Sequence, residues 1–540
     1  MVFNKIMHHF LSVLCLCLFL AVRVVNCDMI SSCSQTPYPE ICNSVGSSPR
    51  STQGDKKPLE FRGLALQANI DHAKRAHQLL LDMDLSALDE RGKLAWADCV
   101  NLSENTMNHL SSSLTSTDPT SFQDAQTWLS AAIANQQTCR NGFTEANLGS
   151  HLDSLPLIMS TELSKFLCNS LAINKAAVTS VAPTSTSTLS SNSGGDRRRL
   201  LATGFPKWVS GAARKLLQIS SIASLADVVV AQDGSGNYRT ISGALSAYKK
   251  LSGDNKRFLI YVKAGVYQEN VQINYNMTNV MLIGDGIDST VVTGNRSFQD
   301  GLTTYRTATF AVIGDGFFAR DITFENTAGA EKLQAVALRS DSDHSVFYRC
   351  SFKGYQDTLY VHSQRQFYRD CDIYGTVDFI FGDAAAVFQN CNIYARKPII
   401  GQMNTVTAHA RVDANENTGI SVHNSRVIAA PDLIPVQGLV KTYLGRPWGE
   451  YSRTVFIKTY LDDLIDPAGW IEWNGTFALS TLYFGEYMNI GNGAGAAGRV
   501  KWPGFHIIND SLEAQKFTAS DLLIGNSWIP ASAVPYTSGL

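Results

Sequence analysis

The sequence predicts a four-helix bundle followed by a parallel β-helix. The segment from Cys350 to Asp357 is echoed 21 residues later from Cys371 to Asp378, with cysteine, glycine and aspartate at the same spacing. A repeat of about 20 residues is typical of a solenoid in which equivalent positions stack. Earlier in the chain, apolar residues recur at helical spacing. We therefore expect an all-β right-handed parallel β-helix preceded by an all-α four-helix bundle.

The N-terminal residues 1–27 predict a secretory signal. Lys5 precedes an apolar run from Phe10 to Val25, which Arg23 interrupts and which is short for a membrane span. We expect cleavage near Cys27, with an uncleaved anchor as the alternative. No later apolar run is long enough to span a membrane, so we expect no membrane association of the mature form.

Residues 28–180 predict the helical bundle. One helix is indicated by Leu66, Ile70, Ala73 and Leu80, and a second by Phe122, Ala125, Leu129 and Ala132. Ser121 is a candidate N-cap of the second helix, with Asp124 three residues on. Further helical stretches surround Cys99 and run from Leu163 to Leu171. Helices with short connections favour an antiparallel bundle.

The chain has 11 cysteines, which fits an oxidising secretory route. In the bundle, the economical pairing is a short disulfide between Cys33 and Cys42 and a second between Cys99 and Cys139 on successive helices. Cys168 is left over. This cysteine spacing and the helix pattern resemble the pectin methylesterase inhibitor and invertase inhibitor family over about 150 residues. In that family the bundle binds an enzyme, and here we expect it to be fused to one.

The segment 181–217 predicts a flexible linker with processing sites. Its first part is rich in serine, threonine and glycine, and two basic clusters follow at Arg197–Leu201 and Arg214–Leu217. An exposed basic run in a linker is a good protease target, whereas the alternative is a solvated charge cluster. We expect a processing protease to cut here.

From residue 218 to residue 540 the sequence predicts the solenoid. Short apolar runs are separated by glycine and aspartate, at Val228–Val230, Phe258–Val262 and Val280–Ile283. Ile283–Gly286 reappears as Ile313–Gly316, which is a second internal echo. A β-sandwich is the alternative, but it does not explain the repeat of 20 to 21 residues. The repeat fades after about residue 505, and we expect the C-terminal segment to pack back on the solenoid.

Composition and missing motifs exclude several classes of function. The net charge of -2 provides no basic footprint for nucleic acid, so a polyanionic partner would need local binding groups. No G-x-S-x-G or H-E-x-x-H pattern occurs, and the histidines show no pairing by spacing. His72 and His77 are expected to face solvent. We therefore expect no cofactor and no metal.

Asp357 and Asp378 form the candidate site, because one solenoid period places them in neighbouring strands about 4.8 Å apart. Two carboxylates so close cannot both ionise freely. Both lie in apolar or aromatic settings, which favours a catalytic pair over the alternative of ordinary turn residues. Spacing alone leaves a retaining glycosidase open, because that mechanism also needs two carboxylates about 5 Å apart.

Several long motifs decide between these chemistries through a resemblance. Residues 227 to 525 resemble a plant-type pectinesterase, or pectin methylesterase, in Thr303–Thr309, Gln334–Leu338, Gly354–Tyr360, Gly375–Gly382 and Leu444–Trp448. The resemblance implies hydrolysis of the methyl esters of galacturonate in pectin, that is, in methyl-esterified homogalacturonan, with release of methanol. It also implies a secreted protein of the plant cell wall.

The resemblance also implies residue roles. Asp378 is the nucleophile, and Asp357 is first the acid for the leaving methoxide and then the base for water. Gln356 and Gln334 donate to the developing oxyanion. Neutral amides suit this role because they do not neutralise the nucleophile. A strand cap and an amide ladder are the structural alternatives for these two glutamines.

In the same way Arg446 orients Asp378, and a guanidinium in that position is expected to keep a nucleophilic carboxylate charged. Trp448 packs against the sugar, and Thr304 is a better candidate for a substrate contact than Thr303. The alternatives are a structural ion pair for Arg446 and ordinary packing for Trp448.

Cys371 and Cys391, one period apart, are predicted to form a disulfide, with stacked thiols as the alternative. Five asparagines carry the N-x-S/T acceptor pattern of N-glycosylation: Asn101, Asn276, Asn295, Asn474 and Asn509.

The expected partners are pectin, the processing protease and inhibitor proteins, and we expect a monomer. The bundle is predicted to mask the solenoid groove until the linker is cut. Two other functions stay open at this point, a glycosidase acting on polygalacturonate and a wall-binding or inhibitor protein without catalysis. New reducing ends would indicate the glycosidase.

Overall fold

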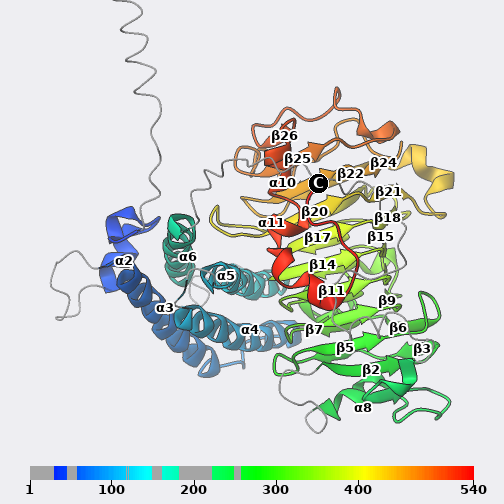
Figure 1. Ribbon diagram of the computed structural model, residues 1–540, viewed down its shortest axis with the longest axis horizontal. Helices are drawn as coiled ribbons and strands as arrows, with labels where there is room; N and C mark the ends of the chain where they lie inside the picture. Colours follow the sequence, from blue (N-terminus) through cyan, green and yellow to red (C-terminus); the bar gives the residue numbers. More distant parts are fainter. Residues whose placement is uncertain are drawn as a thin grey trace, which may run out of the picture.

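The computed structural model describes residues 30–45, 57–116, 118, 121–148, 161–181, 222–248 and 257–540. A bundle of long helices lies beside a stack of short strands (Figure 1). The predicted signal 1–27 is outside the described residues, and so is nearly all of the linker 181–217, including both basic clusters. Within the described part of the chain, none of the helices combines the length and the apolar character needed to cross a membrane.

The bundle consists of four long helices and a short N-terminal one. Asp89 caps the second long helix by accepting a hydrogen bond from the Gly92 N–H at 2.7 Å. Ser121 is the first residue of its helix and not the N-cap, one residue from the prediction. The helices are α2 (Pro39–Val45), α3 (Pro58–Leu81), α4 (Glu90–Thr115), α5 (Ser121–Glu145) and α6 (Thr161–Val181).

The apolar residues that predicted the helices form the bundle core. Leu66 and Leu80 of α3 and Leu129 and Phe122 of α5 are at most 2% exposed. Two disulfides join the bundle residues as predicted, one between Cys33 and Cys42 and one between Cys99 of α4 and Cys139 of α5. Cys168 is free.

Three parallel sheets form the solenoid, and the central coils contribute in turn a strand to sheets A, B and C, whereas the coils at the two ends lack some of these strands. Sheet A contains β1 (Val228–Val230), β2 (Phe258–Val262), β5 (Val280–Ile283), β8 (Phe318–Arg320), β11 (Ser345–Tyr348), β14 (Arg365–Arg369), β17 (Ala385–Gln389), β20 (Gly419–His423), β23 (Arg453–Ile457), β25 (Tyr483–Tyr487) and β26 (Phe505–Ile507).

Sheet B contains β3 (Gly265–Gln268), β6 (Thr290–Gly294), β9 (Thr323–Asn326), β12 (Ser351–Lys353), β15 (Asp372–Gly375), β18 (Asn392–Ala395), β21 (Arg426–Ala429) and β24 (Tyr460–Leu461). Sheet C contains β4 (Val271–Ile273), β7 (Phe310–Val312), β10 (Leu338–Ser340), β13 (Leu359–Val361), β16 (Ile380–Gly382), β19 (Asn404–His409) and β22 (Thr442–Pro447). All pairs of neighbouring strands in the three sheets are parallel, so the fold is a parallel β-helix and the predicted fold class is confirmed.

The first echo stacks as predicted, but the second does not. Ser351 pairs with Asp372, and Leu359 pairs with Ile380, so the echoed segments lie in register in adjacent coils. Ile283 ends a strand of sheet A and pairs with Arg320, whereas Ile313 follows a strand of sheet C. The second echo therefore joins two different corners of the solenoid and does not mark a coil.

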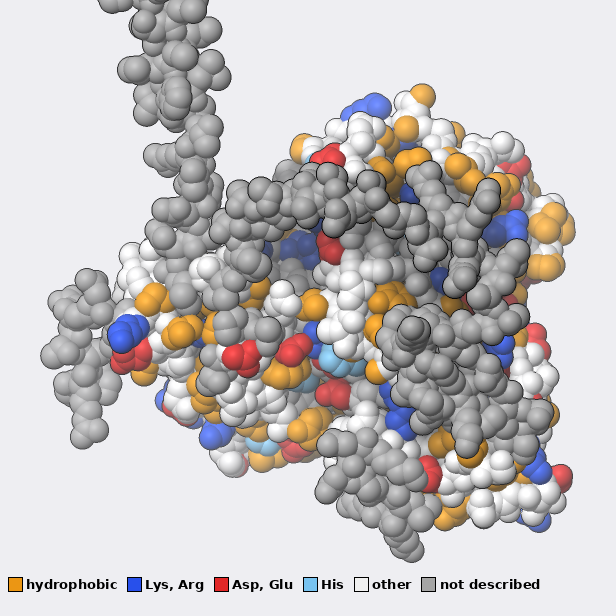
Figure 2. Space-filling view, viewed as in Figure 1, with side chains coloured by type: hydrophobic (Ala, Val, Ile, Leu, Met, Phe, Trp, Pro, Cys, Tyr) orange, Lys and Arg blue, Asp and Glu red, His pale blue; other side chains and the backbone are white. Residues whose placement is uncertain are grey.

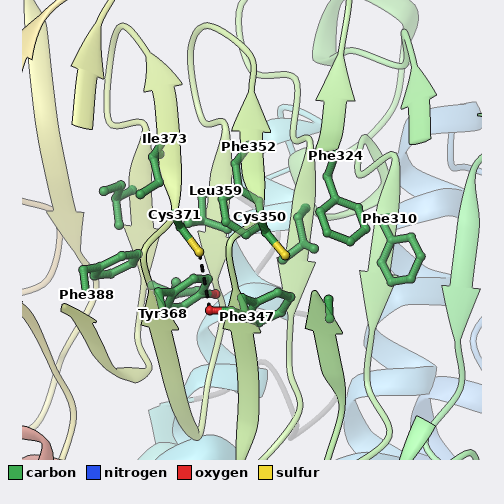
Figure 3. Close-up of a cluster of buried hydrophobic side chains, with 14 of the residues drawn as sticks. Phe310, Phe324, Phe347, Cys350, Phe352, Leu359, Tyr368, Cys371, Ile373 and Phe388 are labelled. Carbon is green, nitrogen blue, oxygen red and sulfur yellow. Dashed lines mark hydrogen bonds between the residues drawn. The ribbon is translucent and has the colours of Figure 1, made fainter. Parts of the chain in front are cut away.

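The predicted disulfide between Cys371 and Cys391 is wrong, because both are free and fully buried, as is Cys350. In the in-register stack each sulfur reaches a backbone carbonyl, and the Cys371 Sγ lies 3.4 Å from the carbonyl oxygen of Phe347 (Figure 3). A disulfide would instead need the two sulfurs turned toward each other with a dihedral near 90°. Stacked thiols, the stated alternative, are what the structure contains.

Aromatic rings stack with the coils around these thiols. Phe347, Tyr368 and Phe388 of three successive sheet A strands have ring centroids 4.8 and 4.5 Å apart (Figure 3). Offset stacking of this kind adds to the area that the rings bury. The interior is thus a filled core, and the chemistry must lie on an outer face.

Short helices complete the solenoid. α8 (Ile241–Leu245) buries apolar residues against the first strands, at the end of the stack (Figure 1). After β26, α10 (Ser511–Gln515) and α11 (Ala519–Leu522) follow, and residues of the C-terminal segment such as Leu523 and Val534 pack on the outer face of sheet A. The predicted return of the C-terminal segment is confirmed.

Candidate active site

The predicted site residues meet in one cavity of about 350 Å³ between the solenoid and the bundle. The solenoid side is built along one edge of sheet C, where the chain enters each strand. Asp357 and Asp378 both stand two residues before paired strand positions, Leu359 and Ile380 (359−357 = 380−378 = 2). Successive coils therefore deliver one side chain each to the same edge. All seven predicted catalytic and substrate-binding residues line the cavity: Gln334, Gln356, Asp357, Asp378, Arg446, Trp448 and Thr304.

Both aspartates occupy left-handed backbone positions. Their φ angles are 61° at Asp357 and 49° at Asp378, a conformation that aspartate tolerates better than most residues. The N–H of Asp357 donates to the carbonyl of Val377 at 3.0 Å, and the N–H of Asp378 donates to the Thr405 hydroxyl at 2.8 Å. The turns are thus fixed by the next coil, which keeps the two carboxylates side by side.

Asp378 is a fully paired carboxylate. Arg446 from β22 donates to it twice, from Nε to Oδ1 at 2.8 Å and from Nη2 to Oδ2 at 2.6 Å. The Thr405 hydroxyl donates to Oδ1 at 2.7 Å. A bidentate guanidinium contact of this type fixes both the charge and the orientation of a carboxylate. Asp378 is 6% exposed, so the pair is held largely out of water.

Asp357 has a different environment, although it is equally buried at 7% exposure. Burial and the neighbouring charge of Asp378 hold the pKa of Asp357 well above its usual value of 3.8, and Glu145 of the bundle adds to the rise, against the opposing charge of Arg446. Asp357 therefore keeps its proton beside a charged Asp378. The pair combines an anionic oxygen and a proton donor in one small cavity.

Gln334 and Gln356 bring amide groups to this cavity from the coil turns that precede β10 and β13. Both side chains are half-buried. The side-chain oxygen of Gln334 is buried and has no hydrogen-bond partner among the described residues. Their backbone carbonyls do accept hydrogen bonds, from Phe298 and Ala335. The turns are therefore anchored, while the side chains stay directed at the cavity.

An aromatic wall closes the other side of the cavity. Tyr360 and Phe381, paired in register, stack with ring centroids 4.2 Å apart, and Trp448 lies 5.9 Å from Phe381. Trp473 stacks 6.5 Å from Trp448 and lies 4.4 Å from the Arg446 guanidinium. Rings of this kind suit the apolar faces of sugars, and Trp473 is 37% exposed at the rim.

The bundle supplies the remaining wall. Asp98 of α4 accepts a hydrogen bond from the Thr303 hydroxyl at 2.7 Å and pairs with Arg306 at 2.7 Å. Glu145, the last residue of α5, accepts a bond from the Thr304 N–H at 2.9 Å. Thr304, predicted to contact substrate, is thus occupied by a carboxylate of the same chain.

Further contacts fix α5 across the solenoid. Arg365 pairs with Asp124 of α5 at 2.7 Å, and the Thr138 hydroxyl lies 2.8 Å from the His362 Nε2. Beyond them, bundle side chains bond to the loop between β19 and β20, at Ala414, Asn415 and Asn417. The contacts of α5 thus run from Asp124 at its start to Glu145 at its end, and in Figures 1 and 2 the bundle accordingly lies against the solenoid.

Several residues that line the cavity were not predicted from the sequence. Tyr360 and Phe381 lie inside motifs that were recognised, and their equal phase could have marked them as a stacked pair. Trp473 stands in an irregular loop without a repeat position. Asp98 and Glu145 are ordinary helix residues, and only the docked bundle shows that they reach the cavity.

The five asparagines of the glycosylation pattern are all exposed, and Asn101 and Asn276 line a second crevice between α4 and the solenoid.

His72 does not simply face solvent, because its ring packs 4.0 Å from Phe166, and His77 Nδ1 lies 2.6 Å from the Ser103 hydroxyl. Among the described residues no three histidine, cysteine or acidic side chains gather in a way that could hold a metal ion.

Comparison with known proteins agrees with this geometry. The family model described as Pectinesterase matches residues 227–526. The chain belongs to the pectinesterase family. A second family model, Plant invertase/pectin methylesterase inhibitor, matches residues 28–173. The chain is therefore a pectinesterase, a carboxylic ester hydrolase, that carries an inhibitor-like bundle in front of its solenoid.

Relatives share this two-part organisation. The "Probable pectinesterase/pectinesterase inhibitor 6" of Arabidopsis thaliana is 51% identical over 538 residues, 96% of each chain. "Pectinesterase 2" of Citrus sinensis is 48% identical, over 95% of each chain. The solved pectin methylesterase from carrot is 54% identical, with a TM-score of 0.57, and matches 58% of this pectinesterase and 98% of its own chain. The carrot chain thus corresponds to a solenoid without a bundle.

Proposed function

We propose that this pectinesterase hydrolyses methyl esters of galacturonate in pectin with Asp378 as nucleophile and Asp357 as acid and base. The Asp378 carboxylate attacks the ester carbonyl, and the proton of Asp357 goes to the leaving methoxide, which departs as methanol. Water then attacks the acyl–Asp378 anhydride while Asp357 takes its proton. The product leaves as the free acid, which gives its proton to solvent, and Asp378 is regenerated with Asp357 protonated.

The observation that carries this assignment is the unequal environment of two stacked carboxylates. Asp378 has two guanidinium bonds and a hydroxyl bond, so it is kept available as an anion. Asp357 has no such donor among the described residues, and its raised pKa keeps the proton that a methoxide leaving group needs. If the two roles were exchanged, the paired anion would have to supply the proton.

The neutral amides fit acyl chemistry. A tetrahedral intermediate at the carbonyl carbon puts negative charge on the ester oxygen, and Gln334 and Gln356 are the uncharged donors that line the same cavity. Trp448 and Trp473 would flank the sugar rings. Arg446 already bonds to Asp378 through both of its forked donors, so its role is to orient and charge-balance the nucleophile.

Methanol release tests the function directly. Chain cut at the basic linker and freed of the bundle should release methanol from methyl-esterified pectin without new reducing ends. Asp378→Ala should abolish the release, and Asp378→Asn should do the same with the side-chain volume kept. New reducing ends would indicate the glycosidase, and full activity of Asp378→Ala would refute the nucleophile.

The bundle is proposed to hold this pectinesterase inactive until a processing protease cuts the linker after secretion to the plant cell wall. Asp98, Thr138 and Glu145 line the same cavity as Asp357, so a polysaccharide cannot reach the pair while the bundle is docked. A variant with Arg197–Arg199, Arg214 and Lys215 changed to glutamine should remain uncut and inactive. Equal turnover by this variant and by the cut, bundle-free protein would refute inhibition.

A further inference from the structure

We infer that Thr405 is the positioning residue of the nucleophile: its hydroxyl holds Oδ1 of Asp378 in place, so that Oδ2 is the oxygen that attacks the ester. This inference rests on the proposed function and adds to it a residue that is not among those lining the cavity. Thr405 was not among the residues predicted from the sequence. It belongs to β19, one coil beyond Asp378, and is 2% exposed.

Thr405 holds the turn that carries Asp378 through three of its groups. Its N–H donates to the carbonyl of Thr376 at 3.1 Å, and its own carbonyl accepts from the N–H of Phe379 at 3.3 Å. Its hydroxyl accepts from the N–H of Asp378 at 2.8 Å. The left-handed backbone of Asp378 lies between the two backbone bonds. One residue of the next coil therefore fixes the backbone from which the nucleophile projects.

The same hydroxyl also acts at the far end of the Asp378 side chain. It donates to Oδ1 at 2.7 Å while it accepts from the N–H of the same aspartate. A hydroxyl has one proton to donate and two lone pairs, so it can make both bonds at once. Threonine is β-branched and its χ1 angle is stiff, and this one is buried. The hydroxyl thus ties the carboxylate to its own backbone and restricts rotation of the Asp378 side chain.

Arg446 alone leaves the carboxylate more freedom. Its guanidinium stands at the end of a long side chain with several rotatable bonds, and that side chain is 27% exposed. Attack on a carbonyl requires the reacting atoms to be aligned at about 3–3.5 Å, and an error of about 1 Å can cost a hundredfold in rate. Arg446 therefore supplies the positive charge, whereas Thr405 supplies a fixed point in a buried strand.

The hydrogen bonds distinguish the two carboxylate oxygens of Asp378. Oδ1 accepts from the Arg446 Nε at 2.8 Å and from the Thr405 hydroxyl. Among the described residues, Oδ2 accepts a single bond, from the Arg446 Nη2 at 2.6 Å. Each oxygen has two lone pairs, so both lone pairs of Oδ1 are occupied and one lone pair of Oδ2 is free. Oδ2 is therefore the oxygen that forms the bond to the ester carbon.

The bond from Thr405 to Oδ1 is kept through both steps of the reaction. When Oδ2 bonds to the ester carbon, the carbonyl electrons move to the ester oxygen and return as methoxide leaves with the proton of Asp357. Oδ1 becomes the carbonyl oxygen of the anhydride and still accepts from Thr405. When water attacks the substrate carbon, Oδ2 leaves with the bonding electrons, and the carboxylate is restored in the same place. Thr405 exchanges no proton and acts by position alone.

The test is a nearly isosteric substitution in the cut, bundle-free enzyme, because the carrot relative shows that a solenoid of this family exists without a bundle. Thr405→Val removes the hydroxyl and keeps the volume of the side chain. It should lower kcat for methanol release about tenfold to a hundredfold, the scale of one hydrogen bond to a charged group. KM should change little, because Thr405 is not among the residues lining the cavity.

Matched variants separate positioning from loss of a buried hydroxyl in general. Thr405→Ser keeps the hydroxyl and should restore most of kcat, whereas Thr405→Ala should not. Thr407→Val removes a buried hydroxyl from the same strand, one that donates to the carbonyl of Leu444 at 2.9 Å, and should leave kcat near that of the wild type. Thermal unfolding checks that each variant is folded. If Thr405→Val does not fold, the comparison of Thr405→Ser with Thr405→Ala provides the same test.

A wild-type kcat in Thr405→Val, or an equal loss in Thr405→Val and Thr405→Ser, would overturn the inference. A crystal structure of Thr405→Val tests it without turnover, since the Asp378 carboxylate should leave its wild-type orientation, and an unchanged orientation would count against positioning. Loss of activity in Asp378→Asn together with full activity in Thr405→Val would refute this inference and not the proposed function. Full activity in Asp378→Asn would refute the proposed function itself.

Discussion

Asp357 and Asp378 have the same local geometry, but the coils that follow them supply different hydrogen-bond donors to the two carboxyl groups. The coil after Asp378 supplies Thr405, and the coil after that supplies Arg446, whereas the coil after Asp357 supplies only the other aspartate. Stacking thus converts a sequence repeat into an ordered pair of an anion and an acid.

The two glutamines allow a quantitative prediction. Gln356→Leu and Gln334→Leu should each lower kcat about a hundredfold or more, because one oxyanion donor is typically worth about 3 kcal/mol. KM should change little if the amides act on the transition state. Initial rates of methanol release on the cut enzyme measure both. Gln437→Leu, at a half-buried residue of the 3₁₀ helix η7 (Ile434–Leu439) outside the residues lining the cavity, is the control, and an unchanged kcat in either cavity variant would contradict the role.

Glu145 makes docking of the bundle depend on pH. Burial raises the pKa of Glu145 above 4.5, and burial raises that of Asp98 above 3.8 despite Arg306 and Thr303. Groups whose pKa is raised on docking stabilise it below their ordinary values, and this contribution is lost as the pH rises through the raised values. Docking should therefore weaken from mildly acidic pH toward neutrality.

Co-elution of the cut bundle with the solenoid across pH measures this dependence. Glu145→Gln, which cannot ionise, should flatten the curve and keep the bundle docked at higher pH. Gln78→Glu, a change at an exposed position of α3 that is outside the residues lining the crevices between bundle and solenoid, is the control. A curve for Glu145→Gln that is as steep as the wild type would show that other groups control docking.

At this scale the sequence predicted which solenoid residues share one cavity, but not which bundle residues cover it. Asp357, Asp378, Gln334, Gln356 and Arg446 lie in repeats or long motifs that fix their place in a coil. Docking is a tertiary event between surfaces far apart in sequence, and no local pattern encodes it. For that reason the carboxylates of the bundle that reach the cavity were not predicted.

The strands of the solenoid and the helices of the bundle contribute different parts of the cavity. The edge of sheet C carries the proposed catalytic pair, because the chain enters β13 and β16 through irregular turns, and irregular backbone tolerates left-handed residues such as Asp357. Helices α4 and α5 carry the cover, and the disulfide between Cys99 and Cys139 ties the two together close to Asp98. The cover is thus cross-linked, whereas the described solenoid contains no disulfide.

Reducing agent should therefore act on one part only. Loss of a disulfide typically costs about 2–4 kcal/mol, so dithiothreitol should lower the midpoint of bundle unfolding. The described solenoid cysteines are already thiols, and its midpoint should not move. Calorimetry on the separated parts measures both. Cys99→Ala/Cys139→Ala is the matched variant for the bundle, and a solenoid midpoint that falls on reduction would contradict the free state of Cys371 and Cys391.

Predictions about the strands failed where a repeated sequence motif was assumed to occupy the same position in two coils. The runs at 258–262 and 280–283 match β2 and β5 residue for residue, because both are short and apolar, and they are buried at four of five and at all four positions. The echo of Ile283 at Ile313 crosses from sheet A to sheet C, since turns of different length precede the two segments. The sequence predicted the position of the stacked cysteines but not their bonding state, because equal spacing does not determine the direction of a side chain.

On the scale of the whole molecule, the bundle is held by contacts spread over much of the solenoid and not by one strong pair. Asp98 and Glu145 bond beside the catalytic cavity, Asp124 bonds to Arg365, and the loop between β19 and β20 bonds to α5 and α6. The sequence of neither domain reveals these contacts by itself. The composition predicted two domains and a linker, but the docked arrangement depends on complementary surfaces that only the folded parts have.

This distributed contact predicts that cutting the linker is necessary for activity but does not complete activation. An intact linker keeps the bundle at an effective concentration on the order of millimolar, so the uncut enzyme should be inactive at any dilution. After the cut, the bundle is retained only by its affinity. The activity per molecule of cut enzyme should therefore rise as the protein is diluted, and added free bundle should reverse the rise. A dilution series of methanol release, with the uncleavable linker variant as control, measures this. Activity of the cut enzyme that is full and independent of concentration would show that the bundle leaves at once and that the linker alone maintains docking.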